Sequence, residues 1–197
     1  MKASLSHRAA LGKRVRGAAL ALLLLSGGCS FSETKQIEVE IRVPKAPARA
    51  TPSRAALVLV VTDAVTERNL SRSDDYILGE KTPLVSVLLD AAVARMRNAG
   101  IEPLQENEKA QATGRLVLSL TKLETSLDGR IWAAQAGLRA ERYDKSGRRP
   151  MGRWESSGRG SHQDSRILSG AAGLAMGKAM GKALDNLPWA AIALGRR

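Results

Sequence analysis

Residues 115–143, RLVLSLTKLETSLDGRIWAAQAGLRAERY, decide the fold because they encode two long strands joined by a tight turn. In the first half of this stretch, Leu116, Leu118 and Leu120 occupy every second position, as expected for a strand that buries one face. Asp128-Gly129 follows, and this dipeptide is a strong signal for a two-residue hairpin turn. The stretch therefore predicts an antiparallel β-hairpin.

The return strand, residues 131–143, alternates between an apolar and a polar face. The apolar face carries Trp132, Ala134, Ala136, Leu138 and Ala140, and the polar face carries Gln135, Arg139 and Glu141. A second turn at Asp144-Lys145-Ser146-Gly147 leads into residues 151–162, where polar residues again alternate with small or apolar ones. These segments predict a three-stranded antiparallel meander whose polar second face meets water.

Two segments before the meander complete the expected sheet and begin to cover it. Residues 55–61, AALVLVV, form a continuous apolar run, which indicates a central strand buried on both faces. Residues 82–100 predict a helix, because Thr82 can cap its first amides, Pro83 suits its first turn and Gly100 suits its end. Polar residues 62–81 are expected to form a long loop, which is a weak candidate for a functional site.

A second long helix is expected after the meander. Asp164 or Ser165 can cap it, and it should end near Leu187, before Pro188. Three glycines at intervals of four, Gly173, Gly177 and Gly181, form a ridge along it. We expect this ridge to allow a close approach to the sheet or to the first helix. Residues 189–197, apolar and then basic, form a tail that could clip onto the core.

The predicted fold class is therefore α+β. We expect a mixed four- or five-stranded sheet with two helices packed on one face, in the order central strand, helix, three-stranded antiparallel meander, C-terminal helix. The length suits one compact domain, assigned to residues 55–197. Because only 3% of residues are aromatic, the core must consist mainly of aliphatic side chains and methionine.

The first 28 residues are typical of a secretory signal peptide. Positively charged residues without an acidic residue precede a short apolar run, which is followed by small residues. The run is too short to span a bilayer, which needs about 20 apolar residues. Leu25-Ser26-Gly27-Gly28-Cys29 resembles a bacterial lipobox and contains the single cysteine of the chain. The alternative is an ordinary secreted protein with a leftover thiol.

We expect Cys29 to become the acylated first residue of the mature protein. Each buried methylene of an acyl chain contributes about 0.8 kcal/mol, so several chains hold a domain on a membrane durably. With Ser30 after the cysteine, the resemblance to sorted lipoproteins implies the outer membrane, with the domain facing the periplasm. Residues 29–54 contain an alternating stretch at 37–43 and then three prolines, so they are expected to form a lipidated tether.

The chain is basic, and the charge suggests a binding surface. The formal charge of +12 includes five positive residues of the signal peptide, so the mature chain carries +7. An exported protein meets anionic lipid, lipopolysaccharide and acidic proteins rather than nucleic acid. The candidate partner-binding residues are Arg139, Arg153 and Arg159, with Trp154 as an anchor. The alternatives are a solvated charged face, and core packing for the tryptophan.

The residues give little support for catalysis. The mature chain has one histidine, His162, and its only cysteine is expected to be acylated, so we expect no metal site. No nucleophile elbow and no phosphate-binding glycine loop is found. We therefore expect a protein that is not an enzyme and has no cofactor.

The order of elements resembles the YajG-like family of bacterial outer-membrane lipoproteins. The resemblance rests on the lipobox, on Thr82-Pro83-Leu84 opening a helix, on residues 114–120 with Asp128-Gly129-Arg130, and on a helix over residues 171–186. It departs most at residues 159–163, where an apolar or aromatic residue is expected. The resemblance implies location and fold, because the function of that family is not established.

The leading functional hypothesis is a non-enzymatic outer-membrane lipoprotein that binds a protein or cell-wall partner in envelope assembly or maintenance. Its possible partners are an envelope protein, peptidoglycan or lipopolysaccharide. The alternative is an accessory lipoprotein for lipid or lipopolysaccharide transport. That alternative predicts an apolar groove between a helix and the sheet.

Overall fold

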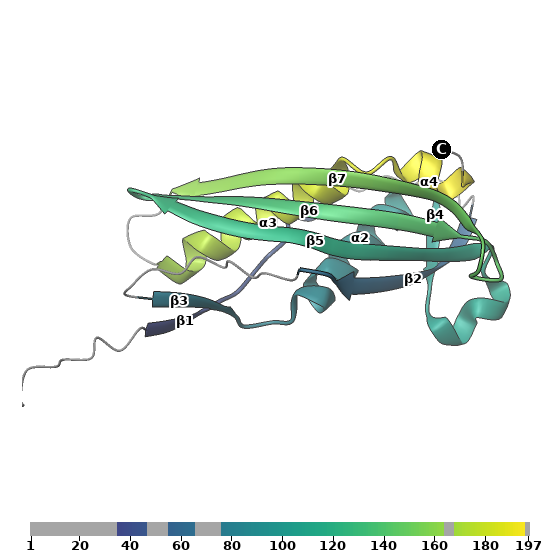
Figure 1. The fold of residues 1–197 in the computed structure, drawn as a ribbon, viewed down its shortest axis with the longest axis horizontal. Coiled ribbons are helices and arrows are strands. Elements are labelled where there is room, and N and C mark those ends of the chain that lie inside the picture. Colours follow the sequence, from purple (N-terminus) through teal and green to yellow (C-terminus); the bar gives the residue numbers. More distant parts are fainter. Residues whose placement is uncertain (1–34, 47–54, 66–75, 164–167, 196–197) are drawn as a thin grey trace, which may run out of the picture. The chain divides into compact units, whose positions relative to one another are not determined.

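The computed structural model describes residues 35–46, 55–65, 76–163 and 168–195 (Figure 1). The expected signal peptide, Cys29, residues 66–75 of the expected loop and the expected helix caps Asp164 and Ser165 lie outside the described residues. None of the helices within the described ranges is long and apolar enough to cross a membrane.

A five-stranded mixed sheet forms the framework of the domain. Its strand order is β4-β2-β5-β6-β7. The strands are β4 (Ile101–Leu104), β2 (Ala55–Asp63), β5 (Gly114–Asp128), β6 (Ile131–Tyr143) and β7 (Pro150–Gln163). β2 is parallel to both of its neighbours, and β5, β6 and β7 are antiparallel. The predicted central strand and three-stranded meander are confirmed.

The described residues contain three α-helices, of which two were expected from the sequence and the third lies in the expected tail. α2 (Leu84–Asn98) and α3 (Leu168–Asp185) lie behind the sheet in Figure 1, which confirms two helices on one face. Thr82 does not cap α2; instead, the amide of Leu84 donates to Glu80 Oε2 at 3.3 Å. The expected C-terminal tail contains a short helix, α4 (Trp189–Leu194), with Ile192 fully buried.

The polar connections contain more regular structure than expected. β1 (Lys35–Val39) and β3 (Tyr76–Glu80) form a two-stranded parallel sheet, so the last part of the expected 62–81 loop is a strand. The polar stretch before β5 contains β4 and a 3₁₀ helix, η1 (Glu106–Gln111). These elements are short, and their partners are distant in sequence, so periodicity does not reveal them.

Part of the expected tether packs onto the domain. Val39 and Ile41 are buried, and the glycine ridge of α3 lies against the backbone that follows β1. A Cβ atom on Gly173 would lie 2.1 Å from the carbonyl oxygen of Glu40, and one on Gly177 would lie 2.0 Å from that of Arg42. The expected close approach therefore exists, but it is made to residues 40–44 rather than to the sheet or α2.

The contact between α3 and the sheet uses glycines of the strand instead. A Cβ atom on Gly158 or Gly160 would lie 2.2 Å from the carbonyl oxygen of Ala179 or Ala175, respectively. The backbones of α3 and β7 are therefore in direct contact. The core between the helices and the sheet is largely aliphatic, as predicted, and its largest members include Trp132, Leu57, Leu88, Met96, Leu116 and Met176.

Candidate functional site

The strands of the meander present a polar surface on the side away from the helices, which we name the outer face. In the cross-strand register, Gln135 of β6 lies between Glu124 of β5 and Arg159 of β7. Four residues further along β6, Arg139 lies opposite Glu155. The outer face includes Lys122, Glu124, Ser126, Ala133, Gln135, Arg139, Glu141, Arg153, Glu155, Arg159 and Ser161.

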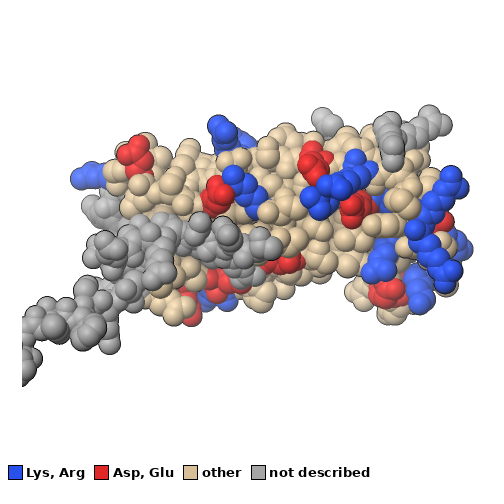
Figure 2. Space-filling model, in the orientation of Figure 1, with Lys and Arg blue, Asp and Glu red and all other residues tan. Residues whose placement is uncertain are grey.

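Two of the three predicted arginines are paired with carboxylates. Glu155 Oε1 accepts from Arg153 Nη2 at 2.7 Å and from Arg139 Nε at 3.2 Å. Glu141 Oε1 lies 3.9 Å from Arg153 Nε. Acidic and basic groups accordingly lie side by side over the strands in Figure 2. The outer face is thus mixed in charge rather than uniformly basic, because each of these arginines has an acidic residue opposite or two positions away.

The hydrogen bonds with Arg153 and then with Arg139 lower the pKa of the Glu155 carboxyl below its ordinary value of 4.5. A carboxyl with a lowered pKa contributes stability above its ordinary pKa and loses that contribution as the pH falls through the folded value. The pairs therefore persist at neutral pH and break only under acidic conditions. All three side chains are exposed, so the contribution of the cluster to stability is small.

Replacing Glu155 by glutamine is expected to release both arginines from their shared carboxylate. The variant should bind a cation-exchange resin more tightly and elute at higher salt, because two guanidinium groups lose the negative charge beside them. Its thermal midpoint should stay close to that of the parent, since exposed ion pairs contribute little to stability. Asp144→Asn, which removes one negative charge outside this cluster, is the control, and equal elution of the two variants would contradict the expectation.

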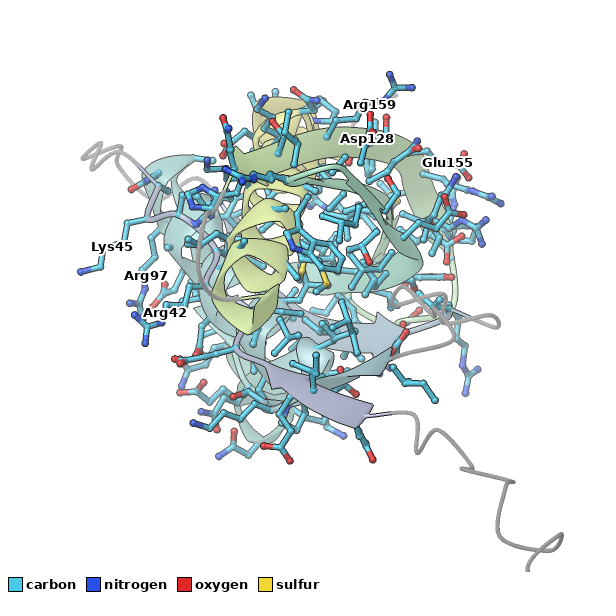
Figure 3. All side chains as sticks on the ribbon, turned by 90° about the vertical axis from the view of Figure 1, so that its left-hand side faces the viewer. Arg42, Lys45, Arg97, Asp128, Glu155 and Arg159 are labelled. Atoms are coloured by element: carbon cyan, nitrogen blue, oxygen red, sulfur yellow. The ribbon has the colours of Figure 1, made fainter. Side chains whose placement is uncertain are left out.

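Arg159 differs from the other two arginines because no ion pair joins it to any residue in the described ranges. It lines a depression of about 460 Å³. The depression is bordered by Glu124, Thr125, Ser126, Ala133, Ala134, Gln135, Arg159, Gly160, Ser161 and Lys182. Figure 3 shows Arg159 projecting from β7 into solvent. The structure therefore brings one predicted site residue, Arg159, to a hollow that outer-face residues line together with Lys182 of α3.

Trp154 does not lie with the arginines. Its ring covers Gly152, where a Cβ atom would meet Trp154 Cη2 at 2.5 Å, and it packs against the core cluster. This follows from the alternation of β7, because residues 153, 155 and 159 share the outer face and residue 154 takes the inner one. Core packing, the alternative given for this tryptophan, describes its position.

Arg142, one of the basic residues of the meander, is also on the inner face. It is buried, and its Nη1 donates to the carbonyl oxygens of Ile192 and Ala193 at the end of α4. Burial lowers the pKa of its guanidinium. Arg142 therefore holds α4 in place, and its even position in β6, shared with Leu138 and Ala140, indicates the inner face from sequence alone.

A second hollow, of about 380 Å³, lies between residues 40–46 and α2. Ile41, Val43 and Ala91 contribute apolar surface to it. Arg42, Lys45 and Arg97 project on this side of the domain, away from Arg159 and Glu155 (Figure 3). Arg42 is paired with Glu40 at 2.9 Å.

Among the described residues, no group of three or more histidine, cysteine, aspartate or glutamate side chains could hold a metal ion. His162 Nδ1 lies 3.4 Å from Lys178 Nζ. The side chains of the outer face carry guanidinium, ammonium, carboxylate, carboxamide and hydroxyl groups. These groups can bind a polar ligand through hydrogen bonds.

No protein-family model matches the chain, and no curated protein matches it. The structure is similar to that of a Xanthomonas campestris protein of the family model DUF330, with a TM-score of 0.53 and 16% identity over 81% of this chain and 96% of that one. It also matches a lipoprotein from Neisseria meningitidis, with a TM-score of 0.37 and 14% identity over 60% of this chain and 90% of that one. The Xanthomonas structure shows that the chain shares its α+β fold with a known protein.

Proposed function

We propose that this protein is a non-enzymatic lipoprotein of the bacterial cell envelope that binds a partner through its outer face. The observation that carries the proposal is the depression at Arg159, where Arg159 and Lys182 have no acidic partner among the described residues. Arg159 lies on the edge strand β7, opposite Gln135 of β6, so its backbone is held by the pairing of the two strands. A guanidinium group on a fixed strand that has no acidic partner among the described residues is available for an anionic ligand.

The lipid anchor is proposed from the sequence and from the reach of the chain. Lys35 is the sixth residue after Cys29, and an extended chain spans at most about 3.6 Å per residue. An acylated Cys29 would therefore keep β1 within about 20 Å of the membrane. We place the protein at the outer membrane with its domain in the periplasm, as Ser30 after the cysteine favours.

The transport alternative predicts an apolar groove between a helix and the sheet, and the contact between α3 and β7 does not provide one. At Gly158 and Gly160 the backbones of α3 and β7 already touch, which leaves no space for an acyl chain there. The hollow between residues 40–46 and α2 offers apolar surface beside exposed basic groups. Lipid that copurifies with the protein, identified by mass spectrometry, would favour this alternative.

The test is photo-crosslinking in cells, with a crosslinking amino acid at Gln135 in the outer face. A matched control carries the same amino acid at Leu89, an exposed position on α2. We expect a specific adduct from Gln135 that is lost in the Cys29→Ser form, because the unanchored protein leaves the membrane surface. Equal adducts from both positions, or none from Gln135, would contradict the proposed surface.

A further inference from the structure

We propose that the depression at Arg159 binds an anionic saccharide, whose carboxylate or phosphate group is held by Arg159 and Lys182. This inference rests on the proposed function, since it names the ligand class of the same surface. The residues that line the depression give it a net positive charge. Glu124, its one acidic member, lies 3.0 Å from Lys122 Nζ, so its charge is already paired. Arg159 and Lys182 leave the hollow with an excess of positive charge.

Lys182 reaches the depression from α3. Lys178 and Lys182 lie four residues apart on α3, and Asn186 follows four residues later, directly after the helix, beside the edge strand β7. Lys178 Nζ donates to the carbonyl oxygen of Ser161 at 3.1 Å, and Asn186 Nδ2 donates to that of Ser157 at 2.8 Å. Lys182, between them, makes no such bond in the described part of the chain and lines the depression instead. Its ammonium group is therefore free to meet an anion.

Small and polar side chains form the floor of the depression. In the register, Ser126, Ala133 and Ser161 form one row across the three strands, and Gln135 stands in the next row. Small residues leave space above the sheet, and the hydroxyl and carboxamide groups both donate and accept hydrogen bonds. The volume of about 460 Å³ falls within the usual range for small-ligand sites, roughly 300–1,000 Å³.

The lining also favours a saccharide over a protein partner at this point. Its apolar members are two alanines, whereas the energetic centre of a protein interface is typically a buried aromatic or large apolar anchor. A sugar carries the hydroxyl groups that match the floor, and guanidinium pairs well with the two oxygens of a carboxylate or phosphate. These features together point to an anionic, hydroxyl-rich ligand.

The experiment is calorimetric titration of the full-length lipidated protein in detergent with three probes. The probes are a galacturonate tetramer, glucose 6-phosphate and the uncharged N-acetylglucosamine tetramer. We expect binding of at least one of the two anionic probes and weaker or no binding of the neutral one. The galacturonate and phosphate arms distinguish carboxylate from phosphate as the recognised group.

Arg159→Gln and Lys182→Gln should each weaken binding of the anionic probe about tenfold or more, as expected for a lost hydrogen bond to a charged group. The matched control is Arg148→Gln, which removes the same charge from an exposed turn residue outside the depression. Equal loss in the control, equal binding of the neutral probe, or no binding of any probe would overturn the inference. A protein adduct at Gln135 without saccharide binding would leave the proposed function standing and reject the saccharide.

Discussion

Alanine at Gly158 is expected to destabilise the domain by about 3 kcal/mol, at the upper end of the cost of overpacking a core. A Cβ atom there would lie 2.2 Å from the carbonyl oxygen of Ala179 and 2.4 Å from the amide nitrogen of Ala183. Both contacts are with helix backbone, so a side-chain rotation cannot relieve them, and α3 would have to move away from β7. The thermal midpoint should fall by about 10 °C, measured by circular dichroism.

The control is Gly170→Ala, within α3, where a Cβ atom would meet nothing within 4 Å. Alanine favours a helix over glycine by about 1 kcal/mol, so this variant should be as stable as the parent or more stable. The pair separates a general effect of glycine replacement from the close contact of helix and strand. Similar midpoints for Gly158→Ala and the parent would contradict the packing described for α3 and β7.

The meander could be predicted from sequence because its strands are long and their alternation is strong. Even the irregularity in β5 is written in the sequence, because the buried leucines move from even positions, ending at Leu120, to the odd position Leu123. The structure shows a shift in register between Leu120 and Lys122 at this point. A β-bulge inserts one extra residue, which changes the phase of all later side chains.

Other parts of the fold depend on contacts that no local pattern specifies. The glycine spacing in α3 indicates that something approaches closely, but it does not say whether a sheet, a helix or an extended segment does so. The prolines predict a tether that includes residues 40–44, but the structure packs this segment against the glycines of α3. β3 and α4 are short, and their stability comes from distant partners rather than from propensity.

The candidate site was only partly accessible to sequence reasoning for the same reason. Counting basic residues identified Arg139, Arg153 and Arg159, but the register decides that Glu155 neutralises the first two and leaves the third. Strict alternation along β7 could have separated Trp154 from them. Lys182 could not have been found, because its place in the depression depends on how α3 lies along the edge strand.

The Arg95→Met variant is expected to lose about 3 kcal/mol in the free energy of unfolding, about as much as Gly158→Ala. Arg95 is only 5% exposed, and it joins three segments. Its Nε donates to Asp185 Oδ1 of α3 at 2.7 Å, and its Nη2 lies 3.4 Å from the carbonyl oxygens of Pro44 and Gly181. Methionine fills a similar volume but removes all three donations, including the buried one to the carbonyl oxygen of Gly181.

Asp185→Asn tests whether the loss comes from the buried donor or from the ion pair. The Asp185 side chain is 54% exposed, so water can replace its partner, and we expect a change of about 1 kcal/mol or less. Urea denaturation of both variants gives the two free energies. If Asp185→Asn were as destabilising as Arg95→Met, the ion pair itself would hold α2 to α3. If both were neutral, the three-way junction of α2, α3 and residues 40–44 would contribute little to stability.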